Sequence, residues 1–184
     1  GMDRIFITSN NFTGLPKGSS IYAVKSDSGI NTNWIIFDNL FNLTQSASFG
    51  GALTILGSSS LNISRNLVYV GVGGNSYSIS VSGLNSFMRN SILADNIFIQ
   101  GKNGVSGHVF LTGFQNSNMT NNTIVSESSL GNAGVIFYGV ESESSVYNSN
   151  ITFNNNVIND SNSNSRAALE FDSSIANSTF GGIF

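Results

Sequence analysis

Seven asparagines recur along this 184-residue chain at intervals of 21 to 34 residues, each followed at once or within a few residues by an apolar residue. They are Asn11, Asn39, Asn66, Asn96, Asn122, Asn156 and Asn177. Short apolar segments run in phase with them, including residues 34–37, 53–56, 109–111 and 135–138. A unit of this length that returns in one fixed order is typical of a solenoid, in which each unit buries its apolar face against the next.

The repeated units carry strand signals rather than helix signals. Short clusters of β-branched and aromatic residues alternate with Gly, Asn, Ser and Asp, which favour turns, and no stretch sustains a period of about 3.6 residues. An all-β sandwich also has short strands, but it predicts no motif that returns every 21 to 34 residues. We therefore predict an all-β fold, a single-stranded parallel β-helix of about six to seven coils, each with three short strands and three turns.

In such a fold, asparagines at equivalent positions of successive coils can stabilise each other. Equivalent residues of successive coils lie one strand spacing apart, about 4.8 Å along the axis. An asparagine at the same turn of every coil can therefore donate to, and accept from, its neighbours on both sides. We predict that the seven asparagines form a ladder whose amides are satisfied inside a turn that water does not easily reach.

Residues 1–184 are expected to form a single β-helix domain, because a chain of this length can bury a sizeable core. Gly1-Met2 is interpreted as a tag remnant. Residues 13–31, which include Pro16 and Lys17, are the least regular part and are expected to cover the first coil as a loop. The pattern has no polar capping unit, so we expect a segment of a longer solenoid, or ends that meet another subunit in end-to-end or trimeric association.

Composition narrows the range of partners. Charged residues are only 9% of the chain, against roughly 25% in ordinary soluble domains, and the net charge of −3 provides no basic footprint for nucleic acid. No apolar run approaches the roughly 20 residues of a transmembrane helix, so we expect no membrane insertion of this segment. With no cysteine and a single histidine, the chain is expected to hold neither a metal site nor a cofactor.

Two groups of short motifs resemble known repeats. Residues 118–124 (Asn-Met-Thr-Asn-Asn-Thr-Ile) and 151–158 (Ile-Thr-Phe-Asn-Asn-Asn-Val-Ile) resemble the right-handed parallel β-helices of the pectin-lyase-like superfamily. Residues 50–53 (Gly-Gly-Ala-Leu) and 87–90 (Phe-Met-Arg-Asn) resemble repeats of adhesin-like and polymorphic outer-membrane proteins of the autotransporter type. The resemblance implies a right-handed helix that is secreted or carried on the cell surface. Residues 3–7 lack the apolar core of a signal peptide and leave the export route open.

Carboxylates beside aromatic rings provide the candidate site. Glu170 and Asp172 are two residues apart on one expected strand, so both should point away from a core that Phe171 enters. Superposing the repeats places Phe137 and Phe110 on the same outward face, one and two coils back. Such a surface suits a sugar, because rings stack on its C–H faces and acids bind its hydroxyls; Glu141 could extend the acidic edge. The alternative is that the phenylalanines pack under a loop and the acids are merely solvated.

Three functions are compatible with these observations. The first is a non-catalytic, adhesin-like surface module that binds glycans or other host or cell-surface ligands. The second is a carbohydrate-active enzyme or phage-tail-type protein that uses Glu170, Asp172 and Glu141, and it would need two carboxyls within roughly 5–9.5 Å of each other. The third is a rod that spaces other domains.

Overall fold

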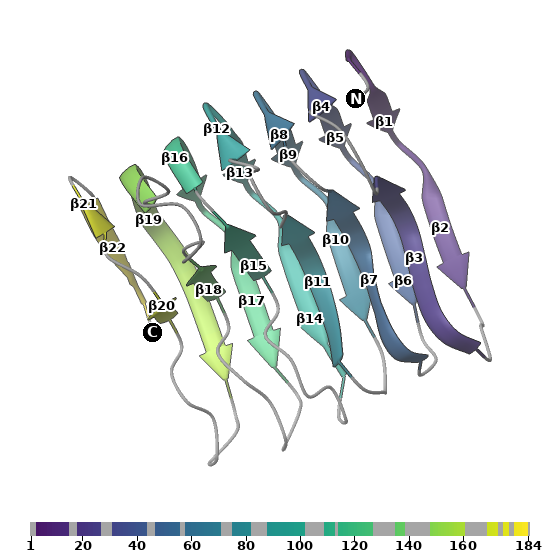
Figure 1. Cartoon of the computed structure of the whole chain (residues 1–184). Helices are drawn as coiled ribbons and strands as arrows, with labels where there is room; N and C mark the ends of the chain where they lie inside the picture. The colour runs from purple at the N-terminus through teal and green to yellow at the C-terminus, as the bar shows by residue number, and fades with distance from the viewer. Residues whose placement is uncertain are drawn as a thin grey trace.

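The computed structural model describes residues 3–14, 18–26, 31–43, 47–55, 58–70, 75–81, 88–101, 109–112, 114–126, 135–138, 148–160, 169–172, 175–176 and 179–183. Within these ranges every regular element is a β-strand, and every pairing between strands is parallel. Successive coils lie side by side along one axis (Figure 1). The chain is therefore a parallel β-helix, as predicted.

Strands that occupy equivalent places in successive coils form four arrays. The first array contains β4 (Asn31–Thr32), β8 (Ser58–Ser59), β12 (Met88–Arg89), β21 (Ile175–Ala176) and the beginnings of β16 (Phe114–Thr120) and β19 (Asn148–Asp160). The second contains β1 (Phe6–Thr8), β5 (Ile35–Phe37), β9 (Asn62–Ser64), β13 (Ile92–Ala94), β22 (Thr179–Ile183) and the continuations of β16 and β19.

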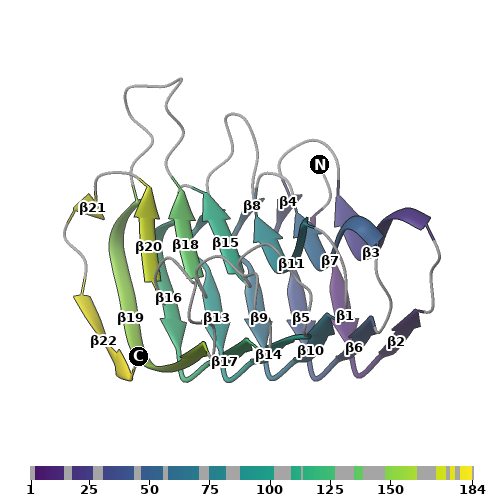
Figure 2. The same ribbon diagram turned by 90° about the horizontal axis from the view of Figure 1, so that it is seen from below.

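The other two arrays complete each coil. The third contains β2 (Asn11–Gly14), β6 (Leu40–Leu43), β10 (Leu67–Val70), β14 (Ile97–Gln100), β17 (Thr123–Ser126) and the end of β19. The fourth is a separate six-stranded sheet of β3 (Gly18–Ser26), β7 (Ala47–Ile55), β11 (Asn75–Val81), β15 (Val109–Thr112), β18 (Val135–Tyr138) and β20 (Leu169–Asp172). Figure 2 shows strands of successive coils side by side, among them β20, β18, β15, β11, β7 and β3 of the fourth array.

The observed coil differs from the predicted one in two ways. The two-residue strands of the first array add a fourth strand position to the three that were predicted. Residues 13–31 are not an irregular loop throughout, because Gly18–Ser26 forms β3 and pairs along its length with β7. Pro16 and Lys17, which suggested a loop, lie outside the described residues.

Two sharp corners in each coil are made by non-glycine residues with positive φ. One set comprises Arg4, Asn33, Ser60, Asn90, Asn116 and Asn150, and the other comprises Ser9, Asp38, Arg65, Asp95, Asn121 and Asn155, all with φ between 48° and 57°. The two corners are five residues apart in each of these six coils. Most of these residues are Asn, Asp or Ser, and Asn and Asp are the non-glycine residues that most readily adopt the left-handed conformation. Between the corners, the strands of the second array therefore have a fixed length.

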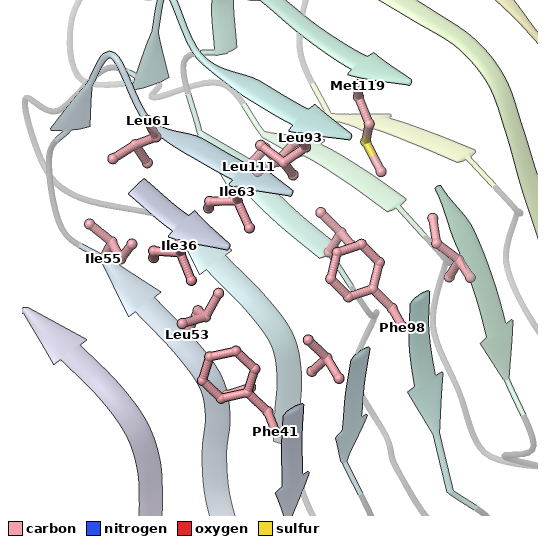
Figure 3. Packing of buried hydrophobic residues seen from close by; sticks show 14 of the residues in the cluster. Ile36, Phe41, Leu53, Ile55, Leu61, Ile63, Leu93, Phe98, Leu111 and Met119 are labelled. Atoms are coloured by element: carbon pink, nitrogen blue, oxygen red, sulfur yellow. The ribbon is translucent and has the colours of Figure 1, made fainter. Parts of the chain in front are cut away.

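The core consists of apolar side chains aligned by the register of the strands. The inward row of the second array holds Ile36, Ile63, Leu93, Met119 and Phe153, and all five are fully buried. The facing row of the third array holds Phe41, Val68, Phe98, Ile124 and Ile158. Figure 3 shows residues of both rows, with Leu53 and Leu111 of the fourth array, directed into the interior. At the N-terminal end the rings of Phe12 and Phe41 stack with centroids 4.8 Å apart.

A buried asparagine ladder runs along the second corner, as predicted. Its buried members are Asn39, Asn66, Asn96, Asn122 and Asn156, each exposed by 2% or less. The Oδ1 atom of each accepts the backbone N–H and the side-chain N–H of the asparagine one coil earlier, with donor–acceptor distances of 2.9–3.2 Å. Each Nδ2 also donates to a carbonyl of the preceding coil at 2.7–3.0 Å.

The ladder begins at Asn10 and not at Asn11. The backbone N–H and Nδ2 of Asn10 donate to Oδ1 of Asn39, whereas Asn11 opens strand β2 opposite Leu40. In each coil the ladder residue directly follows the corner residue with positive φ, which here is Ser9. With two adjacent asparagines, only the position of that corner decides which one enters the ladder. Asn177 lies outside the described residues.

A shorter ladder of two serines lies at the first corner. The backbone N–H of Leu61 donates to Oγ of Ser91 at 3.1 Å, and the backbone N–H of Ser91 donates to Oγ of Ser117 at 2.9 Å. Each hydroxyl in turn donates to the carbonyl two residues before it, at 2.8 Å and 2.6 Å. Both serines are exposed by only 1%, so these hydroxyls satisfy backbone groups that water does not reach.

Replacing Ser91 by Ala is expected to lower the free energy of unfolding by about 1–2 kcal/mol, because the buried N–H of Leu61 loses its acceptor. Urea denaturation followed by circular dichroism measures this loss. Ser149→Ala, at a half-buried position, is a suitable control and should change the free energy by less than about 0.5 kcal/mol. Equal stabilities for wild type and Ser91→Ala would show that the serine ladder contributes nothing.

Candidate binding surface

The acids and rings predicted to bind sugar fall on the fourth array, but not all in one row. Phe110 in β15 is in register with Ile136 of β18, which is in register with Glu170 of β20. Phe137 is one position further along and is aligned with Leu111 and Phe171. The superposition of repeats that aligns Phe137 with Glu170 is therefore wrong, because Ile136 occupies that position. Because successive strand residues point to opposite faces, a slip of one residue exchanges the two faces.

The remaining parts of that predicted site stay predictions. Glu170 and Asp172 are two positions apart on β20. Glu141 lies outside the described residues. Leu111, which is in register with Phe137, is fully buried.

A second candidate surface is the outward face of the third array, which we call the outer strip. It consists of two parallel rows of side chains. One row contains Asn11, Leu40, Leu67, Ile97, Thr123 and Val157. The other contains Thr13, Asn42, Tyr69, Ile99, Val125 and Asn159. All twelve are exposed or half-buried, and none is charged.

The outer strip exposes large apolar side chains at positions where a strand with one solvated face usually carries polar ones. Leu67, Ile97 and Val157 are exposed by 39%, 43% and 37%, and they follow one another in the row with only Thr123 between the last two. The half-buried ring of Tyr69 lies in the other row between Asn42 and Ile99. A contiguous exposed apolar patch with polar groups around it is typical of a surface that binds a ligand or partner.

A row of polar side chains at the second corner borders the strip. We call it the ridge, and it contains Asp38, Arg65, Asp95 and Asn121. Arg65 forms an ion pair with Asp38 at 2.9 Å, and its guanidinium carbon lies 4.7 Å from the centre of the Phe37 ring. One coil further, Asp95 accepts a hydrogen bond from Nδ2 of Asn121 at 3.1 Å. Asp95 and Asn121 are both exposed. The ridge therefore places polar groups that can bind hydroxyls two residues from the row of Leu67 and Ile97.

Polar contacts between coils also occur beside the first corner, at Asp3. Asp3 accepts hydrogen bonds from Oγ1 of Thr32 at 2.6 Å and from Nδ2 of Asn33 at 2.8 Å. These bonds stabilise the ionised form and hold the pKa of the Asp3 carboxyl below its ordinary value of 3.8. These hydrogen bonds connect the first coil to the second, which is a structural role.

The chain has no match among protein-family models, curated proteins or solved structures. Among the residues that the structure describes, no three His, Cys, Asp or Glu side chains are grouped so that they could hold a metal ion. No helix long and apolar enough to cross a membrane occurs in the described part of the chain. The geometry and chemistry of the outer strip are therefore the basis for a functional proposal.

The sequence contains a signal for the outer strip, which is the lack of apolar–polar alternation in two strands of the third array. Residues 67–70 (Leu-Val-Tyr-Val) and 97–100 (Ile-Phe-Ile-Gln) are almost continuously apolar. A strand with one solvated face alternates between apolar and polar residues, whereas these strands carry apolar side chains on both faces. Since inward Val68 and Phe98 are buried, Leu67, Tyr69, Ile97 and Ile99 have to face outward.

Proposed function

We propose that this chain is a non-catalytic β-helix module that binds glycans through the outer strip. An adhesin-like role at the cell surface or as a secreted protein, and kinship with the pectin-lyase-like superfamily, belong to the same proposal. They rest on the resemblance of the short repeats in residues 50–53, 87–90, 118–124 and 151–158.

The observation that carries the proposal is the place of Tyr69 in the outer strip. Tyr69 is in register with Asn42 of the preceding coil and is accompanied in the parallel row by exposed Leu67 and Ile97. Sugars have apolar C–H faces and polar hydroxyls, so they suit a surface with a ring and aliphatic groups beside amides and hydroxyls. Strands held in a continuous ladder keep these groups at fixed positions, which lowers the entropic cost of binding.

A glycan array with wild type and Tyr69→Ala tests the proposal. Wild type should bind at least one class of glycan, and Tyr69→Ala should weaken that binding at least about tenfold, which corresponds to about 1.4 kcal/mol. Thr152→Ala, on the outward face of the second array, is the matched control and should bind as wild type does. Absence of glycan binding by wild type would contradict the proposal.

Two further measurements distinguish the proposal from a binding site on β20 and from a glycan-cleaving enzyme. Glu170→Ala should bind like wild type; if it loses binding while Tyr69→Ala retains it, the site lies on β20 and not on the outer strip. Chromatography of the incubated glycan should show unchanged chain length. Shortened products would identify a glycan-cleaving enzyme instead of a non-catalytic module.

A further inference from the structure

We infer that the ligand of the outer strip is a neutral, linear glycan that lies along the helix axis, with successive sugars over successive coils. This inference rests on the proposed function and adds the charge, shape and direction of the ligand.

The charge of the ligand follows from the composition of the strip. None of its twelve side chains carries a charge, and Arg65, a cation of the bordering ridge, is paired with the carboxylate of Asp38 at 2.9 Å. A uronate or sulfated chain on this surface would have to desolvate its anionic groups with no cation in either row to pair with them. A neutral polymer avoids that cost, and its hydroxyls find the amides of Asn42 and Asn159.

The dimensions of the strip fit one extended chain. From Thr13 to Asn159 each row crosses six coils, so five spacings of about 4.8 Å give a length of about 24 Å. The rows are two residues apart, which is about 7 Å across the strip. Counting four residues of width, the area is about 300 Å², well below the roughly 800 Å² that each partner buries in a stable protein interface. The strip alone is therefore smaller than the surface that a second copy or a folded partner buries in a stable interface.

The direction of the ligand follows from where the polar groups lie. Amides occur in the row of Tyr69 at Asn42 and at its last position, Asn159, with Tyr69, Ile99 and Val125 between them. The exposed Asp95 and Asn121 of the ridge run parallel to the same axis, along one side. A chain that lies along the axis meets the ring and both amides, whereas a chain that crosses the rows meets only one coil.

Isothermal titration calorimetry with neutral oligosaccharides of two to six sugars tests this inference, using cello- and chito-oligosaccharides as probes and oligogalacturonates as charged controls. Affinity should rise at least tenfold between the disaccharide and the hexasaccharide. Asn159→Ala, three coils from Tyr69, should weaken the hexasaccharide at least threefold and leave the disaccharide unchanged. Tyr69→Ala should weaken both.

The outcomes distinguish this inference from the proposed function. Binding that does not depend on chain length, an unaffected hexasaccharide in Asn159→Ala, or preference for oligogalacturonates would overturn the inference while leaving glycan binding intact. Failure of every glycan to bind would overturn both. A dimer in sedimentation velocity that Ile97→Lys converts to monomer would show that a second copy covers the strip, and would overturn the inference as well.

Discussion

Replacing Asn96 by Ala is expected to lower the free energy of unfolding by about 3–5 kcal/mol. Asn96 is fully buried, and its Oδ1 accepts the backbone and side-chain N–H groups of Asn66, each at 3.0 Å. Its Nδ2 donates to the carbonyl of Ile63 at 2.8 Å and to Oδ1 of Asn122 at 2.9 Å. Alanine leaves these partners buried without it, and an unsatisfied buried polar group costs about 1–3 kcal/mol. Chemical denaturation measures the loss.

Two related variants isolate the role of the amide. Asn118→Ala removes an exposed asparagine in the same part of the helix and should change stability by less than about 0.5 kcal/mol. Asn96→Asp keeps an acceptor but buries a carboxyl, whose pKa burial raises. Its folded state then binds more protons than its unfolded state, so its stability should increase as pH falls from 7 toward 4. Equal losses for Asn96→Ala and Asn118→Ala would contradict a structural role for the ladder.

Replacing Phe98 by Ala is expected to lower the free energy of unfolding by about 3–5 kcal/mol. Phe98 is fully buried in the middle of its row, between Val68 and Ile124 of the neighbouring coils. Removal of the ring leaves a cavity that these neighbours, fixed by their strand pairing, cannot fill by collapse. Thermal and chemical unfolding should both register the loss.

The residue before Phe98 provides an internal control. Ile97 lies on the same strand, points to the opposite face and is 43% exposed. Ile97→Ala should therefore cost less than about 1 kcal/mol, and Phe98→Leu, which keeps most of the volume, less than about 1.5 kcal/mol. A larger loss from Ile97→Ala than from Phe98→Ala would mean that the inward and outward faces of the third array have been exchanged.

The architecture could be predicted because a coiled fold repeats one environment many times. Asn39, Asn66, Asn96, Asn122 and Asn156 meet the same buried corner, and the same residue type satisfies it each time. Five recurrences at similar intervals provide a signal that a single turn does not.

Details that depend on a shift of one residue could not be predicted. Asn10 and Asn11 are chemically identical, and only the positive φ of Ser9 selects the first for the ladder. Superposing the repeats aligns Phe137 with Glu170, whereas the observed register places Ile136 there, because the segments between strands vary in length and obscure the alignment. Pro16 and Lys17 interrupt the strand pattern directly before Gly18–Ser26, so the sequence predicts a loop where the structure has β3.

The candidate site was the part least accessible from the sequence. Carboxylates and aromatic rings can be recognised in a sequence as possible binding groups. The outer strip consists largely of Leu, Ile, Val and Thr, which cannot be distinguished from core residues in the sequence. Its significance appears only when strand register separates inward Val68 and Phe98 from outward Leu67 and Ile97.

The most direct test of the β-helix is to observe the side-chain amides of the ladder in solution. At 19.5 kDa the chain is suited to ¹⁵N-edited NMR. Nuclear Overhauser effects are expected between the Nδ2 protons of Asn66, Asn96 and Asn122, which are 26 and 30 residues apart in sequence, with slow exchange against D₂O. Side-chain amides that exchange as fast as that of exposed Asn118, with no contacts between them, would contradict the stacked coils on which the fold and the outer strip depend.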